Sequence, residues 1–440
     1  MRTTVGRESC HPWHHWLQGS LSLAPVNLPG RPAHPIADAP VDASVRPAVL
    51  RMLLALGVVF LMLATTGWTA VHRPETAVPA RAAALAAWAT ARVDGRPVPA
   101  ADAPVRTVAR FFADLDPTRR NHLADGYPLV VGSLDGVPAA TRYRANHNAL
   151  AQTARLEEAR GKDVALTPAD RANAIRRAHR FESLAEGNRQ ILLFDPPGDG
   201  LVAEVFGDLD GARRVSVIVP GVDTDALTFE RSQRRLTAPA GMGQSLYEAQ
   251  RATAPAARTA VIAWAGYVAP TGVGVDAATG RLAVLGSVRL ASLAAALPVD
   301  ASVALFCHSY GSVVCGVAAH ALPERVTDVV VAGSPGMRVG NAAELHTSAR
   351  VWATRAEGDW IADVPHLEVG GVGHGADPVS PAFGARLLSS AGAHSHTGYF
   401  EPGTASLENF AKIGTGGFGS VACANGSDDC RNGISGTDGD

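Results

Sequence analysis

Apolar residues are arranged in three different patterns along this chain, and the points where the pattern changes divide the chain into regions. Residues 52–71 form one uncharged apolar run. Residues 75–188 carry apolar side chains at helical spacing, and from residue 189 short apolar runs alternate with amphipathic stretches. The period of the apolar positions is the main sequence signal for secondary structure. We therefore expect one apolar segment, then a helical region, then a domain that alternates strands and helices.

The apolar run predicts a signal peptide or a transmembrane anchor over residues 46–72. The run is about as long as a bilayer-spanning helix, and Arg46 and Arg51 precede it with few acidic residues. By the positive-inside rule, residues 1–45, which we expect to be disordered, stay in the cytoplasm and the rest is exported. A buried core helix and a permanent anchor are the alternatives to a cleaved signal. The sequence leaves a cleaved signal and a permanent anchor both open, although the small residues that follow, Ala77, Ala80 and Ala82, would suit a signal.

The region 75–188 is expected to form helices that act as a cap or a cell-envelope spacer. Its helical patterns lie at 80–92, 105–116, 150–160 and 168–185. The last of these follows Thr167, a typical capping residue, and has proline at its first helical position. The intervening block 130–146 is irregular for a helical bundle, and we expect a structured connection there.

From residue 189 the pattern predicts an α/β fold. Two apolar runs, 190–195 and 201–206, flank Pro-Pro-Gly-Asp-Gly, which is typical of a hairpin. Further strands are predicted at 214–219, 259–264, 302–307, 328–333, 350–355 and 385–389. Helical patterns lie at 244–253, 286–297, 312–322, 340–347 and 407–413. An antiparallel start followed by strand–helix alternation is the order of an α/β-hydrolase. We assign this fold, with a mostly parallel sheet, to residues 189–420, and a flexible tail to 421–440.

The run Cys307-His308-Ser309-Tyr310-Gly311 follows the fifth predicted strand and precedes a helix of small residues. A strand, a sharp turn with serine at its apex and a helix together form a nucleophile elbow. The usual pattern is G-x-S-x-G, and here cysteine, which is also small, replaces the first glycine. An ordinary Ser-Gly turn after a buried strand is the alternative. The position after the fifth strand favours Ser309 as a catalytic nucleophile.

The chain order Ser, Asp or Glu, then His in this fold locates the other two members of a catalytic triad. The acid should follow a strand beyond the elbow, and Asp359 comes after the seventh predicted strand, just past a turn glycine. Glu357 and Asp363 in the same loop are the alternatives. We select His396 as the base because it lies in the loop after the last predicted strand. The other candidate bases are His366, His374 and His394.

Two backbone amides are predicted to bind the oxyanion that forms during acyl transfer. One is the N–H of Tyr310, directly after the nucleophile. The second should come from the loop after the third strand, where we choose the N–H of Val222, with Gly221 as the alternative. His308 is expected to pack beneath the loop rather than act as the base, because the neighbour of the serine points away from its hydroxyl.

Five short sequence segments, which follow one another in chain order, match the motifs of a known family. They are Val131-Gly-Ser-Leu-Asp-Gly-Val-Pro138 with Arg142, Ala145 and Asn146, then Val219-Pro-Gly221, His308-Ser-Tyr-Gly-Ser312, Gly333-Ser-Pro-Gly336 and His396-Thr-Gly-Tyr-Phe400. Together they resemble an actinobacterial α/β-hydrolase family formerly labelled DUF1023, over roughly residues 125–415. The resemblance implies a hydrolase fold and supports Ser309 and His396 as catalytic residues, because both lie in motifs that match the family. Asp359 matches the family only by its position in the chain and not by a distinctive motif. It implies no particular substrate.

Cysteine usage fits an exported protein. Of five cysteines, Cys423 and Cys430 bracket a short polar segment and predict a small disulfide loop. Cys307 and Cys315 flank the elbow. The sequence is compatible both with a disulfide between them and with two buried free thiols. The chain has no Cys-x-x-Cys spacing, so the sequence does not indicate a zinc site.

Composition narrows the classes of function. The chain has 440 residues, of which 47% are hydrophobic, and a net charge of −2, so it can bury a large core and gives no electrostatic case for nucleic-acid binding. We predict an esterase- or lipase-like serine hydrolase, exported to the cell envelope or secreted, that cleaves an acyl ester. Its substrate would be a small molecule or a lipid, and no metal or organic cofactor is needed. A peptidase or acyltransferase with the same triad, or a non-catalytic envelope interaction protein, is the alternative.

Overall fold

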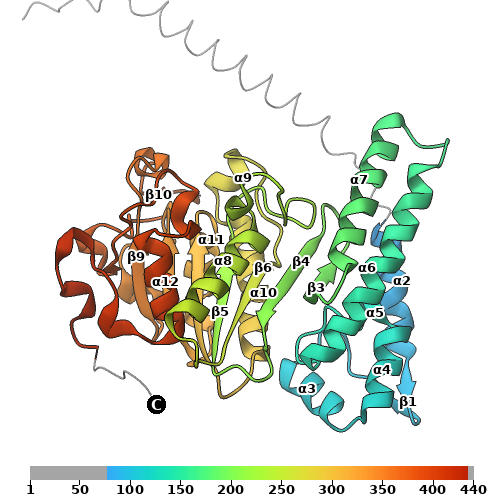
Figure 1. Ribbon diagram of the computed structural model, residues 1–440. Helices are drawn as coiled ribbons and strands as arrows, with labels where there is room; N and C mark the ends of the chain where they lie inside the picture. Colours follow the sequence, from blue (N-terminus) through green and yellow to red (C-terminus); the bar gives the residue numbers. More distant parts are fainter. Residues whose placement is uncertain (1–76, 435–440) are drawn as a thin grey trace, which may run out of the picture. The chain divides into compact units, whose positions relative to one another are not determined.

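An eight-stranded sheet is the central element of residues 77–434, which the computed structural model describes (Figure 1). The predictions for residues 1–45 and 46–72 lie outside this range. Within it, no helix combines the length and apolar character needed to cross a membrane. The strands of the sheet are β3 (Gln190–Asp195), β4 (Leu201–Gly207), β5 (Arg214–Val219), β6 (Thr259–Ala265), β7 (Ser302–His308), β8 (Val326–Ala332), β9 (Arg350–Thr354) and β12 (Arg386–Leu387).

The strand order in this sheet is β12-β9-β8-β7-β5-β6-β4-β3. Strand β4 pairs antiparallel with β3 and β6, and the other pairings are parallel. An edge hairpin followed by parallel strands, with β5 lying between β6 and β7, is the arrangement of an α/β-hydrolase. The predicted α/β-hydrolase fold with a mostly parallel sheet is therefore confirmed, and the fifth strand of the sheet, β7, leads into the serine turn.

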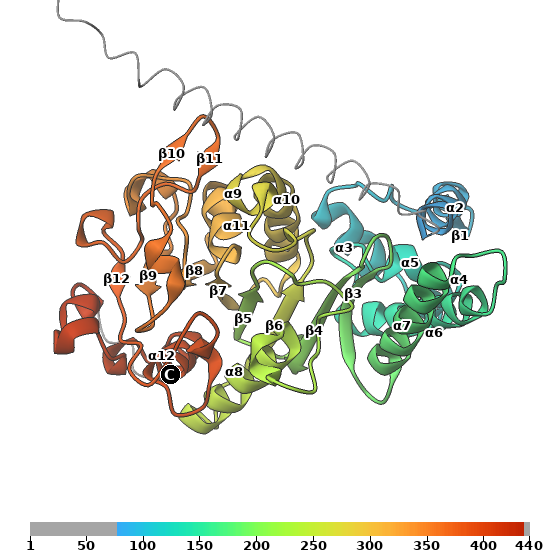
Figure 2. The ribbon, with the colours of Figure 1, turned by 90° about the horizontal axis from the view of Figure 1, so that it is seen from above.

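Alternate residues of the central strands face two different layers of helices. Val217 and Leu305 belong to a hydrophobic cluster that includes α10 and α11, whereas Ile218 and Phe306, the next residue in each strand, belong to one that includes α8 and α12. Figure 2 shows these two pairs of helices on opposite faces of the sheet. Because both faces are covered, the strands appear in the sequence as nearly continuous apolar runs. The bounds are α8 (Pro239–Thr253), α10 (Arg281–Ala296), α11 (Gly311–Ala318) and α12 (Ala405–Thr415).

The region before the sheet is helical. Its helices are α2 (Ala77–Thr90), α3 (Val105–Ala113), α4 (Pro117–Gly126), α5 (Pro128–Val131), α6 (Ala139–Gly161) and α7 (Pro168–Ala185), and a short hairpin joins β1 (Arg92–Val93) to β2 (Arg96–Pro97). The block 130–146, expected to be irregular, contains the end of α5, a turn and the start of α6. Asn146 fixes this turn by donating hydrogen bonds to the carbonyl oxygens of Gly132 and Ile191, at 3.0 and 2.8 Å. Buried polar residues therefore masked the helical period in this block.

The expected helix 340–347 is reduced to a single 3-10 turn, η3 (Ala342–Leu345). The Asn341 side chain caps its start, and His346 ends it in the left-handed conformation with φ of 48°. In contrast, α9 (Val275–Ala278) and the hairpin of β10 (Glu368–Val369) and β11 (Val372–Gly373) were not predicted. These small elements lie beside the cavity described below.

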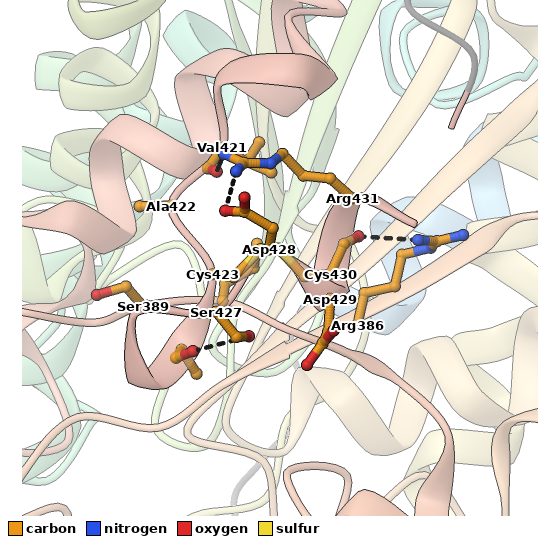
Figure 3. Close-up of a disulfide and its surroundings, with 12 residues drawn as sticks. Arg386, Ser389, Val421, Ala422, Cys423, Ser427, Asp428, Asp429, Cys430 and Arg431 are labelled. Carbon is orange, nitrogen blue, oxygen red and sulfur yellow. Dashed lines mark hydrogen bonds and ion pairs between the residues drawn. A yellow bond between two sulfur atoms is a disulfide. The ribbon is translucent and has the colours of Figure 1, made fainter. Parts of the chain in front are cut away.

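Residues 421–434, expected within a flexible tail, pack against the edge of the sheet. Val421 is fully buried, and Cys423 forms a β-bridge with Leu388. Figure 3 shows a disulfide between Cys423 and Cys430 and the hydrogen bond that Arg386 of β12 donates to the carbonyl oxygen of Cys430, at 2.8 Å. The small disulfide loop is thus attached to β12, which the polar composition of the segment did not reveal.

Candidate active site

Ser309 lies in a strained turn between β7 and α11. Its φ is 55°, in the left-handed region that residues other than glycine rarely adopt. Two glycines make room for the turn. A Cβ on Gly311 would lie 2.1 Å from the Val219 carbonyl oxygen, and one on Gly221 would lie 2.6 Å from the Cβ of Ser309. This backbone has the geometry of a nucleophile elbow, which presents the serine hydroxyl at the end of the sheet.

Ser309, His396 and Asp359 form one hydrogen-bonded chain. His396 Nε2 lies 2.8 Å from Ser309 Oγ, and His396 Nδ1 lies 2.8 Å from Asp359 Oδ1. The acid follows β9 and the histidine lies in the loop after β12, so residues far apart in the sequence meet beside the elbow. Because the carboxylate accepts the Nδ1–H, Nε2 keeps a lone pair for the serine proton. The three residues selected from the sequence are thus brought together in the geometry of a triad.

Asp359 is buried, and three donors surround its carboxylate. They are His396 Nδ1, the N–H of Ile361 at 2.9 Å and the hydroxyl of Tyr399 at 2.5 Å. Burial raises the pKa of the Asp359 carboxyl, but the hydrogen bonds from His396, Tyr399 and Ile361 outweigh it, and the pKa is lowered. The carboxylate therefore stays charged at neutral pH and can stabilise an imidazolium on His396.

Tyr399 connects this carboxylate to the backbone. Its hydroxyl donates to Asp359 and accepts the N–H of Ala356 at 2.9 Å. Burial raises the pKa of the Tyr399 phenol far above its usual value, so it remains a donor. Sequence reasoning gave Tyr399 no role. Its place in the segment His396-Thr-Gly-Tyr-Phe400 was the only available signal, because its partner lies in another loop.

His308 supports the loop that carries His396. Its Nε2–H donates to the carbonyl oxygen of His396 at 2.7 Å, and its ring centroid lies 4.9 Å from that of His396 and 5.7 Å from that of Tyr399. Burial, together with the nearby His396, lowers the pKa of His308 to about 4. The ring is therefore neutral at pH 7 and packs under the loop, as expected from the sequence.

The predicted oxyanion donors lie next to the serine. Val222, Ser309 and Tyr310 line one cavity, and Gly221 packs directly on the serine side chain. In the described part of the chain, neither the Val222 N–H nor the Tyr310 N–H has a backbone hydrogen-bond partner. The loop is fixed by Tyr267, whose hydroxyl donates to the Pro220 carbonyl oxygen at 2.6 Å. Such N–H groups beside a serine hydroxyl are placed where they could bind a developing negative charge.

A disulfide joins Cys307 to Cys315, with a Cα–Cα distance of 6.5 Å. Both cysteines are fully buried. The bond connects the end of β7 to α11, the two elements that meet at the serine turn. Cysteine at the usual first glycine of the elbow therefore fits the turn and also cross-links it.

The alternative acids and bases lie apart from this chain of hydrogen bonds. Glu357, Asp363 and His394 are exposed. His374 donates its Nε2–H to a backbone carbonyl of α9 at 2.7 Å, and His366 lies 3.8 Å from a carboxylate outside the triad. Across residues 77–434, no three or more His, Cys, Asp or Glu side chains gather in a way that could hold a metal ion.

An apolar cavity of about 340 Å³ opens beside Ser309. Its other walls come mainly from the α9 segment, the loop after Asp359 and the β10–β11 hairpin. Apart from Ser309, Val222 and Tyr310, the lining residues are Val273, Ala277, Ala278, Pro335, Trp360, Ile361, Val364, Pro365, Leu367, Val372, Gly373 and His374. The Trp360 ring also lies against the ring of His396, with centroids 4.8 Å apart.

Sequence reasoning missed the cavity, although its hairpin carries a signal. Gly370 and Gly371 separate the two short strands and have φ of +60° and +87°. Two consecutive glycines with positive φ are typical of the tight type I′ hairpin turn. The strands beside them are only two residues long, so the period of apolar positions could not reveal them.

A family model described as Alpha/beta hydrolase matches residues 195–369, which contain Ser309 and Asp359 but not His396. Two curated relatives from Mycobacterium tuberculosis, from strains CDC 1551 / Oshkosh and ATCC 25618 / H37Rv, are 27% identical over 377 residues, and both are described as uncharacterized. The match covers 73% of this chain and 56% of each relative. The chain thus spans about half the length of the curated relatives it matches.

Solved structures with similarity include a dienelactone hydrolase from Anabaena variabilis. Its sequence is 17% identical to this chain. The match covers 51% of this chain and 93% of the dienelactone hydrolase, with a TM-score of 0.29. A 2,6-dihydroxy-pseudo-oxynicotine hydrolase is 11% identical, with 64% and 82% covered and a TM-score of 0.26. The assignment of the α/β-hydrolase fold rests on the strand order and on the family model.

Proposed function

We propose that this protein is a serine hydrolase that cleaves a carboxylic acyl ester through Ser309, His396 and Asp359. The observation that carries the proposal is the continuous hydrogen-bonded chain from Asp359 through His396 to a serine with positive φ. A serine in an ordinary turn needs neither the strain nor a histidine held between its hydroxyl and a buried carboxylate. Both are what an activated nucleophile requires.

The reaction would proceed in two acyl transfers. Ser309 Oγ attacks the ester carbonyl carbon while its proton passes to His396 Nε2, and the N–H groups of Val222 and Tyr310 hold the oxyanion. The intermediate collapses as the bond to the alcohol oxygen breaks, and that oxygen takes the proton from His396. Water then attacks the acyl-Ser309 carbonyl, giving its proton to His396. The bond to Ser309 Oγ breaks, the serine recovers the proton, and the carboxylic acid leaves.

The apolar cavity beside the serine supports an acyl ester as the substrate over a peptide. A peptidase subsite must also pair the backbone N–H and C=O groups of the peptide, whereas most residues lining this cavity have apolar side chains. A peptidase or an acyltransferase with the same triad is the second reading, and a non-catalytic scaffold is the third.

We further propose that the protein is exported and works in the cell envelope or outside the cell. The two disulfides, Cys307–Cys315 and Cys423–Cys430, support this compartment because such bonds persist in oxidising surroundings. The segment 46–72 would provide the signal or the anchor. The helices before the sheet would then serve as a cap or spacer.

A fluorophosphonate probe, which phosphonylates activated serines, tests the proposal. The wild-type protein should be labelled, and Ser309→Ala should not be. A matched control is Ser312→Ala, which removes the next serine hydroxyl along the chain, bonded to the Cys307 carbonyl oxygen at 3.1 Å, and should leave labelling intact. Folded wild-type protein that takes no label, or equal labelling of Ser309→Ala, would overturn the serine-hydrolase assignment.

A further inference from the structure

The rim of the cavity beside Ser309 is apolar and faces solvent. Trp360, Leu367 and Val372 line the cavity and are nevertheless exposed. Beyond them, Val275, the first residue of α9, is 80% exposed, and Val369 in the hairpin is 71% exposed. Exposed apolar side chains that gather around a binding cavity mark a site of interaction with another apolar body.

The two segments that form this rim are joined to each other. Thr279, just after α9, forms an antiparallel β-bridge with Val372 of the hairpin, and the Nε2–H of His374 donates to the carbonyl oxygen of Ala277 at 2.7 Å. Within the hairpin, Val369 is paired with Val372. The exposed valines therefore belong to one connected structure rather than to separate loops.

Charged residues of the same segments are neutralised by partners. Glu368 of the hairpin pairs with Arg338, and Asp276 of α9 pairs with Arg281 at 2.9 Å. The rim consequently presents apolar side chains with balanced charges beside them. If the substrate were a polar ester dissolved in water, these apolar side chains would stay in contact with water. If they contact an apolar phase instead, their burial contributes a free energy of roughly 25 cal/mol for each Å² removed from water.

We propose that the substrate is a lipid ester presented from a lipid surface: the rim contacts that surface while one acyl chain enters the cavity. This inference rests on the proposed hydrolase function. The lipid surface is the occupant we choose because the rim is continuous with the cavity that contains Ser309. A protein partner or a second copy on the same surface would cover the mouth of that cavity.

The test compares one soluble and one membrane-embedded substrate. The double variant Val275→Ser/Val369→Ser changes only the rim, since neither residue lines the cavity. Its matched control is Val164→Ser/Val299→Ser, at two other exposed valines outside the rim. Each protein is assayed on p-nitrophenyl butyrate in solution and on p-nitrophenyl laurate in phosphatidylcholine vesicles.

We expect the rim variant to lose about tenfold of its activity on the vesicles and to keep its activity on the soluble ester, while the control keeps both. Full vesicle activity in the rim variant, equal losses on both substrates, or a dimer that the rim changes dissociate would overturn the inference. A wild-type protein that hydrolyses neither ester would instead contradict the proposed function.

Discussion

The two sides of Ser309 are built from opposite kinds of side chain. On the His396 side, buried polar groups from three loops bond to one another, ending at the carboxylate of Asp359. On the other side, α9 and the β10–β11 hairpin form an apolar cavity whose rim reaches solvent. The residues of the proposed chemistry thus lie on the polar side of Ser309, and those that would select the substrate lie on the apolar side. Changes on the first side should therefore lower all activities, and changes on the second should alter the choice of substrate.

The largest expected effect is on the polar side, at the acid. Asp359→Asn should lower kcat/KM for p-nitrophenyl butyrate by about 10⁴-fold, because an amide no longer holds His396 in the tautomer that accepts the serine proton. Asp363→Asn, a change of the exposed acid in the same loop, should stay within about twofold of wild type. Activity retained by the first variant and lost by the second would transfer the role to Asp363.

The second prediction concerns the stability of the polar side. Since burial lowers the pKa of His308 to about 4, the unfolded chain binds a proton there more readily than the folded protein between about pH 6.5 and 4. The free energy of unfolding should therefore fall as the pH falls through this window, by about 3 kcal/mol for this group. Chemical denaturation at several pH values measures it. In His308→Gln the fall should be smaller, and an identical pH dependence would refute the buried neutral histidine.

The third prediction addresses the apolar side. Ala278→Phe places a larger side chain in the cavity wall, so it should reduce the preference for p-nitrophenyl laurate over p-nitrophenyl acetate by about 10- to 100-fold. Activity on the acetate should remain near that of wild type. Ala295→Phe, on the exposed surface of α10, is the control and should keep the wild-type chain-length profile. A loss of both activities in Ala278→Phe would show that the two sides are not separable.

The smallest expected effect is at Tyr399. Tyr399→Phe removes one of the hydrogen bonds that lower the pKa of Asp359 and hold its carboxylate in place, so kcat for p-nitrophenyl butyrate should fall about tenfold. Tyr143→Phe is the control, because the Tyr143 hydroxyl is buried without a hydrogen-bond partner in the described residues. A wild-type kcat in Tyr399→Phe would limit its role to packing.

The sequence allowed much of the polar side to be predicted. The order of strands placed Ser309 after β7, and the chain order of the fold then pointed to Asp359 and His396. Ser309 directly follows β7, and Asp359 and His396 lie in the loops that follow β9 and β12, so the apolar period of the strands located all three. Tyr399 could not be predicted in the same way, because its hydrogen bond to Asp359 depends on how two loops fold against each other.

The apolar side escaped prediction for a different reason. Its walls are short elements, with four residues in α9 and two in each hairpin strand. Segments of this length are too short to show a period of apolar positions. Their valines and alanines are also as common in a buried core as around a cavity, so residue type gives no signal either. The Thr279–Val372 bridge and the hydrogen bond from His374 to Ala277, which join the α9 segment to the hairpin, make them one surface.

The most direct test of the central claim is to find where an acyl group becomes attached. Wild-type protein is mixed with p-nitrophenyl butyrate, stopped with acid within the first turnover, digested and mapped by mass spectrometry. We predict a burst of one p-nitrophenol per protein and a butyryl group on the peptide that contains Ser309, both absent from Ser309→Ala. A butyryl group on another residue, or turnover with neither a burst nor an adduct, would contradict the proposal.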